Sequence, residues 1–323
     1  MTPRCIVYMS LAAAVAAPLC AQAQDFTPTG DRILSDPTYL PLQGQFSGDT
    51  AYGYERSDGD VFDATGARMA TTSHTQNIVR QNFAYGLTDA LSLNVGIGYG
   101  FSGQGRVVTA NGVTQTNENG WEDPRLGATY RLLDQRNHPV SLDIMGEYSP
   151  DVFESRNATP TQDGTIARGG SETDLGVGLG RETRFFTLRG VFFDKYFGAS
   201  TSDNPNTGGT ADTNAYWVPS VGIQTQTRFT DRLSANVGAD YNFNGSPRVV
   251  SAAGVARTAK LGDYQTVNVS LNYHFIPNRL VGSVNYHHTF QDRTNEVFAD
   301  PTLDLFRERS SDGVGAELRY VFK

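Results

Sequence analysis

Apolar and polar side chains alternate along much of the chain, and the clearest run covers residues 91–101. Every second residue of that run is apolar, with serine, asparagine or glycine in between. The apolar set is Leu91, Leu93, Val95, Ile97, Tyr99 and Phe101. On a strand these side chains share one face, whereas on a helix they would go round all sides. The run therefore predicts a β-strand with one apolar and one polar face.

The final stretch, residues 313–322, alternates in the same way. Its apolar face carries Val314, Ala316, Leu318, Tyr320 and Phe322, and its other face carries Glu317 and Arg319. A strand of this kind suits a wall between lipid and water. Because an unpaired backbone group is costly in hydrocarbon, such a last strand is expected to pair with the first one and close a barrel. We therefore predict that Leu318, Tyr320 and Phe322 lie on a barrel-closing strand.

The whole chain gives about twelve such strands, joined alternately by long polar loops and short turns. They are predicted over residues 45–55, 74–87, 91–101, 121–132, 140–150, 172–182, 185–198, 214–229, 233–244, 266–275, 280–290 and 313–322. An even number of strands of about 10 residues, with long loops on one side only, is typical of outer-membrane barrels. Two soluble β domains would have no reason to keep that asymmetry. We predict an all-β, transmembrane, antiparallel up-and-down β-barrel.

The N-terminal region and the composition add to this prediction. Residues 1–23 join a basic start to an apolar run and a small-residue site, which predicts a signal peptide. Residues 24–43 contain three prolines and no alternation, so they are expected to form a periplasmic extension or a short plug, and residues 44–323 the barrel. The mature chain has no cysteine, and the net charge of −8 argues against nucleic acid as a partner.

Two stretches carry a family resemblance. Residues 84–93 read Ala-Tyr-Gly-Leu-Thr-Asp-Ala-Leu-Ser-Leu, and residues 120–133 read Gly-Trp-Glu-Asp-Pro-Arg-Leu-Gly-Ala-Thr-Tyr-Arg-Leu-Leu. They resemble stretches of a family of transporter-like outer-membrane barrels that is labelled as the meta-pathway of phenol degradation. Here Glu122 and Thr129 stand where that family has Gly and Lys. The resemblance implies a route for small, often hydrophobic or aromatic molecules. The C-terminal stretch also resembles the targeting signature of bacterial outer-membrane barrels, although Lys323 follows the terminal aromatic residue.

Charged residues of both signs fall on the predicted inward faces. They are Asp49, Glu55, Arg80, Arg125, Arg131, Asp143, Glu147, Asp174, Arg228, Asp240, Glu317 and Arg319. An arginine facing the middle of the lipid costs on the order of 2 to 4 kcal/mol, so these side chains are expected to line the lumen. They would form either a lattice of salt bridges or a polar eyelet that orients a passing solute. Arg189 and Lys195 join them if the seventh strand faces that way.

One pair can be named within this set. If the turn between the fourth and fifth strands is centred near Arg136, residues whose numbers sum to about 272 lie opposite each other. This register places Arg125 across from Glu147, and Arg131 one diagonal step from Asp143. The facing of the seventh strand stays open, because its phenylalanines occupy both faces.

The histidines do not indicate a catalytic or metal site. His274 and His287 share an inward face of one hairpin, but with His287 opposite Asn268 they would be about 20 Å apart. No histidine is followed two residues later by serine, the pair that outer-membrane phospholipases use. We expect no enzyme, no metal and no cofactor, although a hydrolase assembled from separate strands stays open.

These observations predict a protein of the cell outer membrane of a Gram-negative bacterium, acting as a channel for passive diffusion or uptake of a small solute. The alternative is a structural or surface-interaction barrel with a plugged lumen. The expected partners are outer-membrane lipid and lipopolysaccharide, the barrel-assembly machinery and the solute. The predicted loop at residues 245–261 carries Arg248, Arg257 and Lys260 and no acid, so it either contacts lipopolysaccharide phosphates or is simply solvated.

Overall fold

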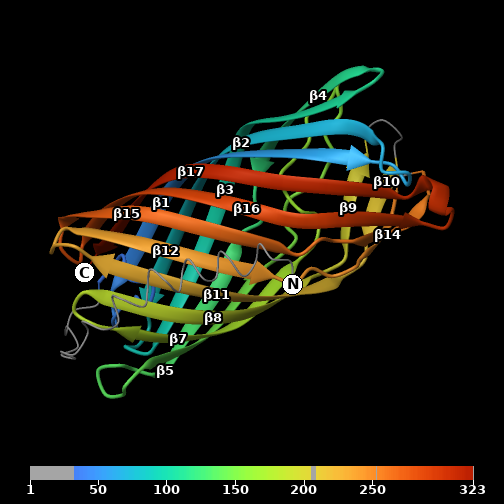
Figure 1. The fold of residues 1–323 in the computed structure, drawn as a ribbon. Coiled ribbons are helices and arrows are strands. Elements are labelled where there is room, and N and C mark those ends of the chain that lie inside the picture. Colours follow the sequence, from blue (N-terminus) through green and yellow to red (C-terminus); the bar gives the residue numbers. More distant parts are fainter. Residues whose placement is uncertain (1–32, 205–208, 252, 323) are drawn as a thin grey trace.

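Twelve antiparallel strands form a closed ring in the computed structural model, which describes residues 33–204, 209–251 and 253–322. They are β1 (Phe46–Phe62), β2 (Arg68–Gly86), β3 (Leu91–Thr109), β5 (Arg125–Leu133), β6 (Ser141–Ser149), β7 (Glu172–Glu182), β8 (Phe186–Phe197), β11 (Tyr216–Arg228), β12 (Leu233–Asn242), β15 (Tyr264–Ile276), β16 (Leu280–Phe298) and β17 (Leu305–Phe322). Each strand pairs with the next one in this order, and β17 lies beside β1 (Figure 1). The prediction of a twelve-stranded antiparallel barrel is confirmed.

The last strand closes the ring along its whole length. Phe46 is opposite Phe322 at one end of the β1 and β17 pair, and Phe62 is opposite Phe306 at the other. The ring of Phe46 lies 6.1 Å from that of Phe322 and 5.3 Å from that of Phe83, measured between ring centroids. Aromatic side chains therefore cover the seam at this end, and the predicted pairing of the last strand with the first is confirmed.

Several predicted loops are strands instead. Residues 56–62 and 68–73 continue β1 and β2, residues 102–109 continue β3, and residues 291–298 and 305–312 continue β16 and β17. The loops predicted as 102–120, 199–213 and 245–261 contain the short strands β4 (Gly112–Trp121), β9 (Ser200–Asn204), β10 (Gly209–Thr213), β13 (Arg248–Val250) and β14 (Ala256–Lys260). These extensions and short strands are mostly polar, so they pair through the backbone without the alternation that marks a membrane strand.

The turn between β1 and β2 shows how the extended strands are joined. The Asp63 carboxylate accepts hydrogen bonds from the Thr65 hydroxyl and from the backbone N–H groups of Thr65 and Ala67. These bonds, the one from the Thr65 hydroxyl above all, hold the pKa of the Asp63 carboxyl below its ordinary value. Gly66 has a φ of 84°, a conformation that glycine adopts without strain.

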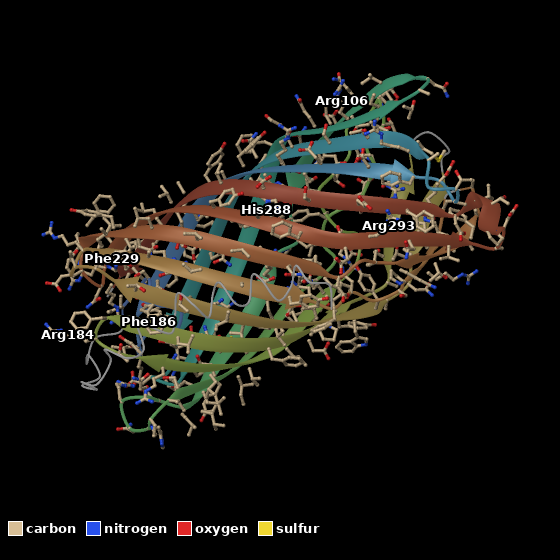
Figure 2. All side chains as sticks on the ribbon, viewed as in Figure 1. Arg106, Arg184, Phe186, Phe229, His288 and Arg293 are labelled. Atoms are coloured by element: carbon tan, nitrogen blue, oxygen red, sulfur yellow. The ribbon has the colours of Figure 1, made fainter. Side chains whose placement is uncertain are left out.

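An apolar belt surrounds the outside of the barrel. Leu93, Val95, Ile97 and Tyr99 of β3 are between 37% and 46% exposed, although a soluble protein would cover such a row. Aromatic contacts border the belt, including Tyr99 with Trp121 and Tyr196 with Trp217 toward the long-loop end. Phe229 and Arg184 lie at the short-turn end (Figure 2). The belt has the composition of a surface that meets lipid. Among the described residues there is no helix long and apolar enough to cross a membrane.

The facing of the seventh predicted strand is decided by its neighbours. On β8, Phe192 is 44% exposed on the outer surface. Phe193 points the other way and fills the space above Gly176, where an added Cβ would lie 2.4 Å from its ring. Arg189 shares the inward face and reaches the backbone of residue 37. The glycines of β7 leave room for Phe193 and Arg189 on the inward face. Because Phe192 lies on the outer face, phenylalanines occupy both faces of β8.

Candidate lumen site

Residues 33–42 cross the interior of the barrel near the end with the short turns. The side chains that bind this segment come from β5, β8, β11, β12, β15 and β17, which are spread around the ring. Leu34 and Leu40 of the segment are each 3% exposed. Gly86 is needed where the segment leaves the interior, because an added Cβ would lie 2.0 Å from the Leu42 carbonyl oxygen.

Three arginines of the wall donate to backbone carbonyl groups of this segment. Arg131 donates to Thr38, Arg189 to Pro37 and, at 3.5 Å, Arg319 to Leu34. A segment without regular structure leaves its carbonyl groups unpaired unless side chains or water reach them. These three arginine side chains therefore supply hydrogen bonds that a neighbouring strand would otherwise supply to the segment.

Asp36 is the charged centre of the segment. Its carboxylate Oδ2 lies 2.7 Å from Nη2 of Arg228 and accepts a hydrogen bond from the Thr187 hydroxyl. Its Oδ1 accepts from the backbone N–H and the hydroxyl of Thr38. Arg228 also contacts Glu182 at 2.9 Å. The Asp36 side chain is only 1% exposed, so the carboxylate is withdrawn from water and fully satisfied by these donors.

Neighbouring polar side chains hold Ser35. Gln226 and Asn236 donate to its carbonyl oxygen, and its hydroxyl lies 3.1 Å from Nε2 of His274. Gln226 is completely buried. His274 is thus a hydrogen-bonding partner of the segment, a role that the sequence did not indicate. His287 is opposite Asn268 as predicted, and no group of three or more metal-ligating side chains occurs among the described residues.

The predicted inward charges fall into two layers. In the layer beside the segment, Asp143 binds both Arg131 at 2.8 Å and Arg189 at 3.1 Å, and Arg319 binds Glu317 at 2.5 Å. Farther from the short turns, Nε of Arg125 lies 3.9 Å from Oε1 of Glu147. In the first layer Asp143 and Arg131 are buried and the side chains of Arg189 and Arg319 are 12% and 35% exposed, whereas the side chains of Arg125 and Glu147 are 49% and 38% exposed.

The register of β5 and β6, from which the pairing of Arg125 with Glu147 was predicted, differs from the prediction by two residues. Glu147 is directly opposite Gly127, and Arg131 is directly opposite Asp143, so the paired numbers sum to 274. The turn is centred near residue 137 and not at Arg136, and the irregularity between Arg131 and Leu133 changes the sum only from 275 to 274. A shift of two residues keeps every side chain on its face, which is why Arg125 and Glu147 still meet, but diagonally.

The other predicted residues have different partners. Arg80 pairs with Glu122 at 2.7 Å, and the space for that pair comes from Gly98. Asp49 accepts from Asn82, and Asp240 from Asn242, each at 2.7 Å. Glu55 is opposite Gln76, and Asp174 stands between Glu147 and Lys195 on the neighbouring strands. The sequence reasoning missed Asp36, Glu122 and Glu182, because each lies outside a regular alternating run or at its end.

An interior cavity of about 230 Å³ lies beyond the segment. Met145 and Phe193 give it an apolar part, and Glu147, Asp174 and Lys195 give it charges of both signs. A second cavity of about 640 Å³ opens on the short-turn side of the segment and is lined by Ile33, Arg228, Ser234, His274 and residues of the turns. The two cavities share no lining residue, and only the second one includes a side chain, Arg228, that binds Asp36.

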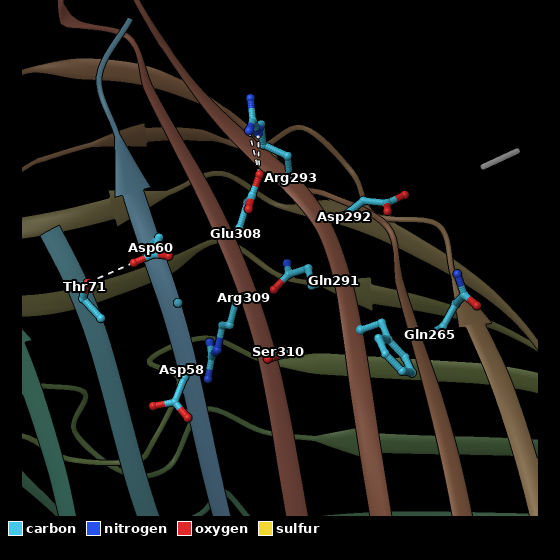
Figure 3. Close-up of a pocket in the computed structure, with 12 residues that line it drawn as sticks. Asp58, Asp60, Thr71, Gln265, Gln291, Asp292, Arg293, Glu308, Arg309 and Ser310 are labelled. Atoms are coloured by element: carbon cyan, nitrogen blue, oxygen red, sulfur yellow. Dashed lines mark hydrogen bonds and ion pairs between the residues drawn. The ribbon is translucent and has the colours of Figure 1, made fainter. Parts of the chain in front are cut away.

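A larger cavity of about 820 Å³ lies at the far ends of β1, β16 and β17 (Figure 3). Its lining is charged, and it contains the Arg293 and Glu308 pair at 2.6 Å and the Thr71 hydrogen bond to Asp60. In the predicted lipopolysaccharide-contacting loop, Arg257 pairs instead with Glu296 at 3.1 Å. At least one of the three basic residues is therefore already neutralised within the protein.

A closed antiparallel ring with an apolar belt, aromatic borders and a charged interior is the fold of an outer-membrane β-barrel, and the protein belongs in the cell outer membrane. The barrel is similar to an outer membrane channel from Pseudomonas putida F1, with a TM-score of 0.55 and 14% identity over 92% of this chain and 100% of that one. It is also similar to the transport unit of the autotransporter AIDA-I from Escherichia coli, with a TM-score of 0.55 and 12% identity over 96% of this chain and 98% of that one. These likenesses concern the fold.

The P. putida toluene transporter TodX is a more distant match, with a TM-score of 0.45 and 12% identity over 86% of this chain and 90% of that one. No protein-family model matches the sequence, and no curated protein matches it significantly. The resemblance to the meta-pathway family therefore stays a prediction from residues 84–93 and 120–133.

Proposed function

We propose that this protein is an outer-membrane channel for passive diffusion or uptake of a small solute, with hydrophobic and aromatic molecules as the first class to test. The observation that carries the proposal is the interior cavity of about 230 Å³ beside Met145 and Phe193. Its apolar part and its charged rim suit a small molecule with an apolar body and a polar end. Because Lys195 and Arg125 accompany Glu147 and Asp174, the passage is expected to discriminate weakly between anions and cations.

We further propose a division of the chain. Residues 1–23 would be the signal peptide, a region outside the described residues, and residues 44–323 would form the barrel that the assembly machinery inserts. Residues 24–43 would act as a plug, which the buried contacts of residues 33–42 support. A solute that leaves toward the periplasm would then have to pass or displace residues 34–38.

The resemblance of residues 84–93 and 120–133 to the meta-pathway barrels supports the same class of solute. In this structure those residues build the turn before β3 and the whole of β5. Ala128 and Thr129 of the second stretch line the cavity, and its charged lining residues come from β6, β7 and β8. The choice of solute is therefore expected to depend on Phe193, Met145 and their charged neighbours.

Planar-bilayer conductance and uptake by proteoliposomes test this proposal. The wild-type barrel should pass a small neutral aromatic solute faster than protein-free liposomes do. A variant without residues 24–42 should show larger conductance steps, because the contacts of the segment are gone. If neither protein conducts or admits any small solute, the channel proposal is wrong.

The second candidate is a structural or surface-interaction barrel with a permanently closed lumen. The segment that crosses the interior favours it, because it is buried and bound on many sides. The two candidates differ in the conductance of the wild-type protein, because a plugged structural barrel conducts no ions until residues 24–42 are removed. A hydrolase would be recognised by release of fatty acid from lipid by the wild-type protein.

A further inference from the structure

The wall beside residues 34–38 contains four guanidinium groups, those of Arg131, Arg189, Arg228 and Arg319. Its own carboxylates at this level are Asp143, Glu182, Glu317 and Asp49, which is directly opposite Arg319. Arg228 is shared between Glu182 of the wall and Asp36 of the crossing segment. Asp36 is therefore the one carboxylate of this group that the wall does not supply.

Asp36 binds between Arg228 and Thr187. Arg228 reaches Oδ2 of Asp36 at 2.7 Å, the Thr187 hydroxyl donates to the same oxygen, and the Arg228 side chain is 10% exposed. A guanidinium group and a hydroxyl group that converge on one carboxylate oxygen give strong, charge-assisted hydrogen bonds. Without Asp36, Arg228 would keep Glu182, but Arg228 and the Thr187 hydroxyl would each lose the acceptor that they share. Buried donors without an acceptor are costly, so this position favours a carboxylate oxygen.

The position can also be reached from one side. The cavity of about 640 Å³ at the short-turn end includes Arg228 in its lining, together with Ser234 and His274. A small anion that enters this cavity would meet Arg228 without crossing the rest of the barrel. The Thr187 hydroxyl lies beside this guanidinium group, 3.2 Å from Nη2 of Arg228.

We propose that Arg228 and Thr187 form a binding site for a small carboxylate, and that the chain's own Asp36 fills this site in the structure. The site takes a one-headed carboxylate such as formate or acetate when the Asp36 side chain is removed. A carboxylate-bearing solute in the lumen competes with Asp36 and releases residues 34–38 from the wall. Only this last step rests on the proposed channel function; the binding site does not.

Binding of acetate to the detergent-folded Asp36→Ala variant tests the site directly. We expect acetate and formate to bind this variant by calorimetry, with wild type binding at least about tenfold more weakly because Asp36 occupies the position, a change equivalent to about 1.4 kcal/mol. Acetamide has the same shape and no charge, and it should not bind. The matched control is Asp58→Ala, which removes an exposed aspartate at the far end of β1.

A second variant tests the assignment of the donors. Thr187→Val in the Asp36→Ala background keeps Arg228 and removes one hydrogen bond, so the affinity for acetate should fall further while the barrel still shows its heat-dependent mobility shift in gels. The proposal is wrong if acetate binds wild type and Asp36→Ala equally, if acetamide binds as well as acetate, or if the Thr187 change has no effect.

Conductance separates the site from the channel. Asp36→Ala should conduct more than wild type, and acetate at high concentration should raise the conductance of wild type toward that of the variant while equal chloride does not. If Asp36→Ala binds acetate but does not conduct, the carboxylate site stands and the channel proposal fails. If it conducts and does not bind acetate, the channel stands and the site is refuted.

Discussion

Arg131 and Asp143 face each other directly across β5 and β6, with Nε of Arg131 2.8 Å from Oδ1 of Asp143. Their side chains are only 5% and 3% exposed, and the same carboxylate also receives Arg189. Two guanidinium groups thus share one buried anion, and both also reach backbone carbonyl groups of the crossing segment. The charges in this layer hold residues 37 and 38 and the wall together, so this layer has a structural role.

Replacement of Asp143 should therefore destabilise the barrel strongly. Asp143→Asn leaves Arg131 and Arg189 without their shared anion, and breaking a buried pair in this way costs on the order of 3 to 5 kcal/mol. Urea unfolding of the detergent-folded protein measures the change in the free energy of unfolding. Arg125→Gln is the matched control, because that exposed pair should contribute less than about 1 kcal/mol. Equal effects of the two variants would contradict the structural role of this layer.

Glu147→Gln should alter conduction while the barrel still folds. The Glu147 side chain is 38% exposed, its partner Arg125 is 3.9 Å away, and it stands directly opposite another acid, Asp174. Removal of one of two adjacent carboxylates makes the cavity rim more positive, so cation preference should decrease. Reversal potentials in a salt gradient measure this preference. Unchanged selectivity with a lowered free energy of unfolding would show that the pair only supports the wall.

Gly86→Ala tests how tightly the segment is held. An added Cβ would lie 2.0 Å from the Leu42 carbonyl oxygen, so the segment must move away from β2. We expect faster proteolysis near residue 42 and larger conductance steps than in wild type. Gly190→Ala is the control, since nothing lies within 4 Å of an added Cβ there. The contact is unimportant if both variants resist protease as wild type does.

Phe322→Ala should reduce assembly more than deletion of Lys323. The Phe322 ring lies against Phe46 and Tyr320 at the closing seam, whereas Lys323 lies outside the described residues. Loss of the aromatic contact exposes the seam at the border of the apolar belt, where aromatic rings are favourable. The yield of heat-modifiable barrel in outer-membrane fractions is the measurement. Equal yields from wild type and both variants would remove the special role given to this ring.

The sequence by itself determined the strand pattern of the membrane wall. Lipid on one side and a polar interior on the other force side chains to alternate, and that requirement is local, so it can be read from runs such as residues 91–101. The same alternation predicted that charges such as Arg131, Asp143 and Arg228 share a face, and that the last strand pairs with the first. It also placed His287 opposite Asn268, because the turn at residues 277–279 is short and fixes the register.

Only the tertiary structure decided what depends on distant or irregular contacts. The turn between β5 and β6 is centred beyond Arg136, which moved their register by two residues from the prediction. The polar extensions of β1, β2, β3, β16 and β17 carry no alternation to reveal them. The sequence did not determine the path of residues 33–42 through the barrel. This segment has no periodic pattern, and Asp36 meets Thr187 and Arg228 more than 150 residues along the chain, so its place depends on the closed barrel around it.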